Sequence, residues 1–518
     1  MIAAELLLVA LLLPQAPAGA GSSIGGRFVS AQTGEPLPGV NVGIEGRLAG
    51  QRLERSARTA PDGTFSLEGL PAGTYSLSAS KTGYRPAMSL PVSVTLAPGQ
   101  NRADLEFRMH RSAVITGTVT GADGEPLAGL RVTAWRFVWS EGRRSVRHSI
   151  QASTDDRGAY RLFGLPPARY VVVVRGPAGE PPTYYPSASR PSEATPVAVQ
   201  WGREASGVHI VVRPGPSFSI AGRLLDAATG GPCRSCSVEI KRLDDVEDSA
   251  LSDSGVAPDG AYRLSGLAPG LYRVWVEKAV PPDRHQASCR DVLLSNRSLD
   301  GVDIAAGIER TLRGRVVLES PPAELPQMKL EVLAQETSGA DWTPIRPDLT
   351  FEISGLAPLK YHLRWRGFPE GAYLKKLRLA GRDLAAPEIQ MPEDGSLAGL
   401  EAVVAFDGAS VAGAVAPPES AGRGHRVTAA LLVLWPQEGQ SPLLIERRIG
   451  TDPSGRFQLN GVAPGAYQLF ALPLTATPEI EDPEIRRRYG SHAQPVELVA
   501  GRRSEVNLVL APESAPEP

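Results

Sequence analysis

Apolar and polar residues alternate along most of the chain in short runs. Between Tyr272 and Val276, for example, every second residue is a buried-type residue, and Arg273 stands between two of them. Alternation with a period of two predicts a strand that buries one face. The last run of the chain repeats the pattern at Val506, Leu508 and Leu510. No long amphipathic helix is indicated, so the pattern predicts an all-β chain.

One composite pattern occurs five times, which indicates internal repeats. It consists of a turn, an aromatic strand, Gly-Leu or Gly-Val, a Pro-containing turn and a tyrosine. The copies span residues 62–75, 156–170, 259–272, 348–361 and 454–467, the fourth being degenerate. Gly63 and Gly158 are 95 residues apart, Gly158 and Gly260 are 102 apart, and Gly455 follows Gly260 by 195. We expect each tyrosine to bury its ring and to bond its hydroxyl to a nearby loop. We also expect a hairpin at each Asp-Gly.

A second element precedes the first in three copies. It is a glycine-containing strand, a turn and another strand, at 24–26 with 33–40, 115–117 with 124–130, and 220–222 with 229–232. Copies four and five keep only its first strand, at 312–316 and 411–415. About seven short strands per repeat predict a β-sandwich. The expected sandwich domains are 22–110, 112–213, 217–305, 309–405 and 409–511, followed by a disordered tail at 512–518.

The consecutive motifs I-x-G-x-V, T-G-x-P-L-P-G-V and D-G-x-F-x-L-x-G-L-P-A-G-x-Y, followed by Lys81-Thr82-Gly83-Tyr84, resemble the carboxypeptidase regulatory-like domain. Copies one to three match well, copy five matches in part and copy four weakly, and together they cover nearly all of 22–510. The resemblance implies a transthyretin-like, seven-stranded Greek-key sandwich, related to Ig-like sandwiches and grouped with carbohydrate-binding-like folds. Such domains are accessory modules of peptidases, receptors and surface proteins, and tandem arrays of them occur in bacteria.

Composition and charge exclude some classes of partner. The chain has 518 residues and a formal net charge of −2, with signs interspersed, so no field favours nucleic acid or an anionic membrane. Residues 1–20 resemble a signal peptide, with an apolar run from Ile2 to Leu13 and a cleavage signal at Ala18-Gly19-Ala20, although the start carries Glu5 and no basic residue. We therefore expect export to a periplasmic, cell-surface or extracellular location. No later apolar run approaches ~18 residues, so we expect no membrane span.

Catalytic chemistry is not indicated. The repeats take up the chain and leave no room for a peptidase domain. None of the 7 histidines pairs at a spacing of three or four, and HExxH is absent. We expect no catalytic residue, no cofactor and no metal, and hence not an enzyme.

The cysteines leave four alternatives open. Cys233 and Cys236 form C-x-x-C in a predicted turn, and in an exported protein a disulfide between them is the default. Cys289 would then be free or paired between molecules; alternatively it bonds to one of the two. Cys233, Cys236, His285 and Cys289 also have the ligand types of a zinc site. A thioredoxin-like redox role is disfavoured, because that motif opens a helix.

Aromatic residues supply the candidate binding site. Trp135, Phe137 and Trp139 lie at every second position of a predicted strand, opposite the core residues Val132 and Ala134. As an exposed row they could stack on sugar rings; alternatively they pack against a neighbouring repeat or under the loop 140–149. That loop carries a basic group that would suit an acidic glycan: Arg143, Arg144, Arg147 and His148. Two other candidates are the exposed pair Tyr184-Tyr185 and Trp275, whose neighbours could equally be the next domain.

Three functions follow from these features. The first is an exported, non-enzymatic structural or adhesive array, because repeats fill the chain. The second is a carbohydrate-binding protein that uses the aromatic row of the second repeat. The third is an accessory subunit of a secreted enzyme or transport system. The partners to consider are a polysaccharide or a cell-surface protein.

Overall fold

The computed structural model describes most of the chain. The described residues are 22–48, 51–86, 92–140, 143–176, 181–213, 215–244, 253–280, 284–321, 327–334, 340–417, 430–452, 455–473, 487 and 489–511. The predicted signal peptide (1–20) and tail (512–518) lie outside them. The chain divides into two compact units, Met1–Ser112 and Ala113–Pro518.

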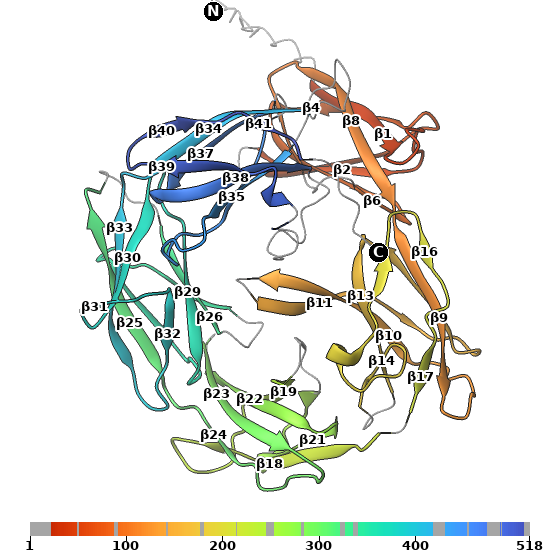
Figure 1. Ribbon diagram of the computed structural model, residues 1–518, viewed down its shortest axis with the longest axis vertical. Helices are drawn as coiled ribbons and strands as arrows, with labels where there is room; N and C mark the ends of the chain where they lie inside the picture. Colours follow the sequence, from red (N-terminus) through yellow and green to blue (C-terminus); the bar gives the residue numbers. More distant parts are fainter. Residues whose placement is uncertain are drawn as a thin grey trace, which may run out of the picture. The chain divides into compact units, whose positions relative to one another are not determined.

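The first unit is one β-sandwich (Figure 1). Its sheets have the strand orders β4-β1-β8-β6 and β3-β2-β5-β7. The bounds are β1 Ser22–Ser30, β2 Asn41–Leu48, β3 Gln51–Arg58, β4 Thr64–Leu70, β5 Gly73–Ser80, β6 Tyr84–Pro86, β7 Val92–Leu96 and β8 Asn101–Arg111.

The second unit begins with a sandwich that carries an insertion. One sheet is β12-β9-β16 with β17 also on β9, and the other is β11-β10-β13-β14 with β15 also on β13. The bounds are β9 Ala113–Gly121, β10 Arg131–Ser140, β11 Arg143–Ser153, β12 Ala159–Leu165, β13 Ala168–Arg175, β14 Thr183–Tyr184, the 3₁₀ turn Pro191–Glu193, β15 Val197–Val199, β16 Glu204–Ala205 and β17 Ile210–Val212.

The third sandwich has the sheets β21-β18-β24 and β20-β19-β22-β23. In Figure 1 the layer of β18 and β21 lies beside the layer of β19, β22 and β23. The bounds are β18 Phe218–Asp226, β19 Cys236–Arg242, β20 Asp253–Ser254, β21 Ala261–Leu267, β22 Gly270–Val280, β23 Arg284–Leu294 and β24 Ile304–Ala306.

The fourth sandwich, whose sequence pattern is degenerate, has the sheets β28-β25-β33-β30-β31 and β27-β26-β29-β32. At the turn where the other copies have glycine, Leu349 adopts a φ of 64°, so this copy keeps the turn at the cost of a left-handed leucine. The bounds are β25 Thr311–Glu319, β26 Lys329–Ala334, β27 Ala340–Pro344, β28 Thr350–Ser354, β29 Lys360–Arg366, β30 Tyr373–Leu379, β31 Arg382–Asp383, β32 Glu388–Gln390 and β33 Leu397–Ala405.

The fifth sandwich has the sheets β37-β34-β40, with β41 also on β34, and β36-β35-β38-β39. The bounds are β34 Ala409–Ala416, β35 Ala430–Pro436, β36 Arg447–Gly450, β37 Arg456–Val462, β38 Gly465–Pro473, β39 Gln494–Leu498, β40 Arg503–Glu505 and β41 Leu508–Val509.

All five sandwiches share a seven-stranded frame. In this common frame three strands form one sheet and four form the other, and the first strand pairs in parallel with the last, as β1 does with β8 and β25 with β33. All sandwiches but the third add strands to the frame, such as β6 in the first and β30 and β31 in the fourth. The prediction of an all-β fold of about five tandem seven-stranded sandwiches is confirmed.

The glycine in each first strand is explained by the close approach of the backbone in or beside the last strand. A Cβ on Gly117 would lie 1.8 Å from the carbonyl oxygen of Val208, and one on Gly222 would lie 2.1 Å from that of Val302. Neither distance can be tolerated, so any side chain would push the last strand off the sheet. The same close approach occurs at Gly26, Gly314 and Gly413.

The Asp-Gly turns do not form hairpins, and that prediction is wrong. β3 pairs with β2, whereas β4 pairs with β1, so the turn between them crosses from one sheet to the other. The Asp62 carboxylate accepts bonds from the Thr64 amide at 3.0 Å and the Thr64 hydroxyl at 2.7 Å. Gly63 has a φ of 78°, and a Cβ there would lie 2.5 Å from the carbonyl oxygen of Phe28. The turn is therefore fixed by its contact with the first strand rather than by strand pairing.

The tyrosine prediction is confirmed in every copy. Each ring is buried in the core of its own sandwich. In four copies the hydroxyl donates to the carbonyl four residues earlier: Tyr75 to Pro71 (2.7 Å), Tyr170 to Pro166 (2.9 Å), Tyr272 to Ala268 (2.7 Å) and Tyr467 to Ala463 (2.8 Å). In the fourth copy the Tyr361 hydroxyl instead accepts from the Ala357 amide at 2.8 Å.

Candidate functional site: a disulfide-bonded loop and an open sheet face

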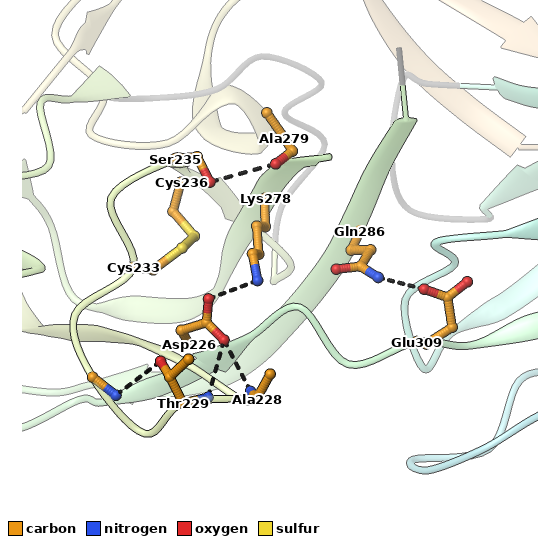
Figure 2. A network of polar contacts seen from close by, with 11 residues as sticks. Asp226, Ala228, Thr229, Cys233, Ser235, Cys236, Lys278, Ala279, Gln286 and Glu309 are labelled. Carbon is orange, nitrogen blue, oxygen red and sulfur yellow. Dashed lines mark hydrogen bonds and ion pairs between the residues drawn. A yellow bond between two sulfur atoms is a disulfide. The ribbon is translucent and has the colours of Figure 1, made fainter. Parts of the chain in front are cut away.

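The C-x-x-C motif lies at the turn before β19. Cys233 and Cys236 form a disulfide with Cα atoms 5.7 Å apart, and Cys233 is buried in the core of the third sandwich (Figure 2). Two of the four donors of the zinc alternative are thereby used. Cys289 is a free thiol on β23, and burial raises its pKa to about 11, so it stays protonated at neutral pH.

The same loop is fixed by a polar network that ends at Asp226, the last residue of β18. Its carboxylate accepts from Lys278 Nζ at 2.7 Å and from the amides of Ala228 and Thr229 at 2.9 and 3.3 Å (Figure 2). The bond from Lys278, followed by those from the amides, holds the pKa of Asp226 below its usual value. The network therefore ties the loop to Lys278 on β22, which makes it a structural clasp.

The loop lies beside the joint between the third and fourth sandwiches. Gln286 on β23 bonds to Glu309 in the connecting segment (Figure 2). The next residue, Arg310, is only 3% exposed, and its guanidinium donates to the carbonyl of Glu393 at 2.7 Å and to that of Ala287 at 3.3 Å. A buried cation therefore bonds to both sandwiches at once.

Gly355 allows the backbones of the third and fourth sandwiches to lie in direct contact. Its carbonyl accepts from the Ala287 amide at 2.8 Å, and its amide donates to the Arg310 carbonyl at 2.9 Å. Its φ is 84°, and a Cβ there would lie 1.9 Å from the carbonyl oxygen of His285. The sequence leaves two roles open for Trp275, ligand binding or contact with the next domain. Trp275 packs with Cys289 against the core of the fourth sandwich, which favours the second role.

A similar joint links the fourth and fifth sandwiches. The Gly408 amide donates to the Gly371 carbonyl at 2.9 Å, and a Cβ on Gly408 would lie 2.5 Å from that oxygen. The Asn460 side chain donates to Glu370 at 2.6 Å. Both joints therefore depend on backbone contacts that admit no extra atom.

The prediction of an exposed aromatic row on the outer face of the β10–β13 sheet is wrong at its first residue, Trp135. Trp135 does lie opposite the core, as the alternation predicts, yet it is only 1% exposed. It packs with Val171, Val173 and Tyr184 in a small second cluster, and its ring meets the Tyr184 ring edge-on at 5.5 Å between centroids. The inserted segment after β13 covers this face, so Trp135 is not available to stack on a ligand.

The other aromatic and basic candidates of the second sandwich fall into two groups, one that the structure describes and one that it does not. Tyr184 is only 1% exposed, so the prediction that the pair Tyr184-Tyr185 is exposed is wrong for Tyr184. The side chains of Phe137, Trp139, Arg143, Arg144, Arg147 and His148 lie outside the described ones. Phe137 and Trp139 therefore stay a prediction.

The fifth sandwich covers its outer face in the same way. Trp435 on β35 is 1% exposed, and its ring packs on Phe470 at 4.5 Å. Its indole N–H donates to Glu446 at 2.6 Å. Tyr489 and Ala511, which come from later in the chain, complete the cluster.

The fourth sandwich leaves a tryptophan exposed on its outer face. Trp342 on β27 is 57% exposed, although the third and fifth sandwiches are in place. Lys329 Nζ lies 4.4 Å from the centre of its ring, within cation–π distance. Beside it on β26, Glu331 accepts from Arg366 Nε at 2.7 Å.

Sequence reasoning missed Trp342. The available signal was a tryptophan between Asp341 and Thr343 in a short strand, next to the alternating run Lys329–Leu333. Leu330 and Val332 of that run are fully buried, and Trp342 pairs with Glu331 between them. The parity of β26 thus predicts that Trp342 points outward, but only once the pairing of β26 and β27 is known.

Within the described part of the chain, no helix is long and apolar enough to cross a membrane.

Comparison with solved structures gives low overall likeness. The minor pilin GBS52 of Streptococcus agalactiae is 16% identical, with a TM-score of 0.23, covering 38% of this chain and 97% of the pilin. The shaft pilin SpaA of Lactobacillus rhamnosus GG is 12% identical, with a TM-score of 0.21, covering 38% and 98%. The Bacillus anthracis TIE protein is 12% identical, with a TM-score of 0.17, covering 76% and 75%. Scores this low carry no argument about function, and no curated protein matches the chain.

The comparison with protein families is specific for the first two sandwiches. The carboxypeptidase regulatory-like domain matches residues 23–110 and again residues 114–212. Each match spans the strands of one complete sandwich, β1–β8 and β9–β17. The chain is therefore a protein that carries carboxypeptidase regulatory-like domains in tandem, over residues 23–110 and 114–212.

Proposed function

We propose that the chain is an exported, non-enzymatic structural protein, in which tandem sandwiches form a scaffold that displays its faces outside the cytoplasm. The observation that carries this proposal is the joint at Arg310 and Gly355. A buried cation is costly unless its donors are hydrogen-bonded, and here carbonyls of two sandwiches accept bonds from the Arg310 guanidinium. Such a joint holds neighbouring sandwiches in one orientation, which suits a scaffold.

The division into five domains extends this proposal. The family match covers the first two sandwiches, and the other three share the seven-stranded frame, the first-strand glycine and the buried tyrosine. We include them as domains of the same kind. The boundaries 217–305, 309–405 and 409–511 are part of the proposal.

The joint is tested by substituting Gly355 with alanine in the full chain, with Gly395→Ala as the matched control. Both glycines have a φ of 84°, but a Cβ on Gly395 has nothing within 4 Å. The backbone strain of the two variants is therefore alike, and only Gly355→Ala drives an atom into His285. We expect Gly355→Ala to speed hydrogen exchange at the Ala287 amide and to broaden the small-angle scattering profile. Equal behaviour of the two variants would contradict a fixed joint.

Export is tested by fractionating bacterial cells that express the full chain. The proposal expects a processed chain that begins at Gly21 and lies outside the cytoplasm. An unprocessed cytoplasmic chain would remove the exported part of the proposal.

A second candidate, carbohydrate binding, is favoured by one observation, the open face around Trp342. It does not depend on the aromatic row of the second sandwich, whose first member is buried.

A further inference from the structure

We propose that the outer face of the β27-β26-β29 sheet in the fourth sandwich binds a carboxylated polysaccharide, with Trp342 as the stacking platform. This inference does not rest on the scaffold function; it rests on the second candidate function, carbohydrate binding, and names its substrate class.

The first step is the position of the ring. Trp342, Glu331 and Arg364 are directly paired across β27, β26 and β29, so they form one row on the outer face. The core side of the same strands is filled by Leu330, Val332, Leu363 and Trp365, all buried. Lys329 lies over one side of the Trp342 ring and, at 57% exposure, much of the ring stays in contact with water.

The second step is that this ring is exposed, whereas tryptophans on the outer faces of other sandwiches are covered. Trp135 and Trp435 lie on the outer faces of the equivalent sheets, and segments later in the chain bury both to 1% exposure. Trp275 on the third sandwich is covered by the next sandwich. Among the tryptophans whose side chains the structure describes on these outer faces, Trp342 is thus the exposed one, and its 57% exposed indole offers an apolar ring to an external partner.

The third step is the charge of the face. Lys329 and Arg366 flank the row and Arg364 lies in it, whereas Glu331 is the one carboxylate among them, so three positive charges and one negative leave a formal +2. Glu331 is bonded to Arg366. Guanidinium groups match the planar geometry of a carboxylate, so the excess charge favours an anionic ligand.

The fourth step concerns the kind of ligand. Small molecules need a concave site that buries most of their surface, whereas the Trp342 side chain is 57% exposed. A protein interface needs an apolar centre, and around Trp342 this face has charged neighbours instead. An extended polymer of sugar rings with carboxylates meets both features, because a ring can stack on the indole while a neighbouring carboxylate reaches Lys329 or an arginine.

The test measures binding of the full chain to polygalacturonate, with the neutral polymer dextran beside it. We expect saturable binding to polygalacturonate only, weakened by salt because the charges are exposed. Trp342→Ala should weaken binding by about tenfold or more, as the loss of a central aromatic anchor does. Phe163→Ala is the matched control, because Phe163 is 53% exposed on β12 of another sandwich, and it should bind like the native chain.

Circular dichroism of Trp342→Ala should be unchanged, so that lost binding is not lost folding. Lys329→Gln should retain the fold and bind several times more weakly. Absence of saturable binding, or equal binding by Trp342→Ala and the native chain, would overturn the proposal. Equal binding to dextran would overturn the anionic ligand. The scaffold proposal is tested by the joint variants and is untouched by any of these results.

Discussion

The second and fourth sandwiches share one frame and treat their outer faces in opposite ways. In both, a tryptophan points away from the core. In the second, the segment between β13 and β15 folds over Trp135 and brings Tyr184 against it. In the fourth, β29 pairs directly with β32, and Trp342 stays 57% exposed among the described residues, with Lys329 over one side of its ring. Outward parity therefore does not identify a binding residue; the presence or absence of a covering segment does.

The largest expected effect is a difference in the loss of stability between Trp135→Ala and Trp342→Ala. Trp135→Ala removes a fully buried ring and should destabilise the second sandwich by about 3–5 kcal/mol. Trp342→Ala removes an exposed ring and should change the stability of the fourth by no more than about 0.5 kcal/mol. Hydrogen exchange of amides in β13 and β29 reads the two sandwiches separately within the full chain. Similar losses in both would break the comparison.

The next effect concerns the tyrosines in the two cores. Tyr361→Phe leaves the Ala357 amide buried without an acceptor, which should cost about 1–3 kcal/mol. Tyr170→Phe removes the donor to the Pro166 carbonyl, a half-buried acceptor, and should cost about 1 kcal/mol. The same exchange measurement compares them. A larger loss in the second sandwich would mean that the reversed bond in the fourth is not important.

A smaller effect is expected where Lys329 lies over Trp342. Lys329→Ala removes a cation–π contact worth about 0.5–1 kcal/mol at an exposed site. The ring should then become more mobile, and its fluorescence should be quenched more readily by acrylamide. Fluorescence of the Trp342→Phe chain supplies the background from the other tryptophans. Unchanged quenching would show that Lys329 does not orient the ring.

The smallest effect is a pH dependence of the fourth sandwich. Burial lowers the pKa of His362 on β29, an effect that Glu388 partly opposes. Because the unfolded chain then binds the proton more readily, the fourth sandwich should be most stable above the ordinary histidine pKa and lose stability as the pH falls through the lowered value. His362→Gln should flatten this dependence in exchange measurements between pH 7 and 5. A stability that rises on acidification would contradict the assignment.

Much of the fold could be predicted from sequence because each repeat carries local signals. The first-strand glycine, the turn glycine and the tyrosine each occupy a position that the geometry requires. The connectivity at Asp62-Gly63 could not be predicted, because a tight turn has the same sequence whether its strands pair or separate into two sheets. The disulfide between Cys233 and Cys236 follows the default for an exported turn.

The candidate site could be predicted only in part. The parity of Trp135 was readable from Val132 and Ala134, yet its cover comes from a segment about 50 residues later, and period-two patterns do not report such contacts. Trp342 was missed for the opposite reason, since β27 is short and its pairing with β26 is not evident from its own residues. Which faces are covered depends on tertiary packing rather than on local pattern.

The most direct test of this account is hydroxyl-radical footprinting of the full chain, read by mass spectrometry at each tryptophan. Exposed indoles are oxidised much faster than buried ones, so the account predicts fast oxidation at Trp342 and slow oxidation at Trp135 and Trp435. Adding polygalacturonate should slow oxidation at Trp342 alone among these three. Comparable rates at Trp135 and Trp342 would contradict the distinction between covered and open faces.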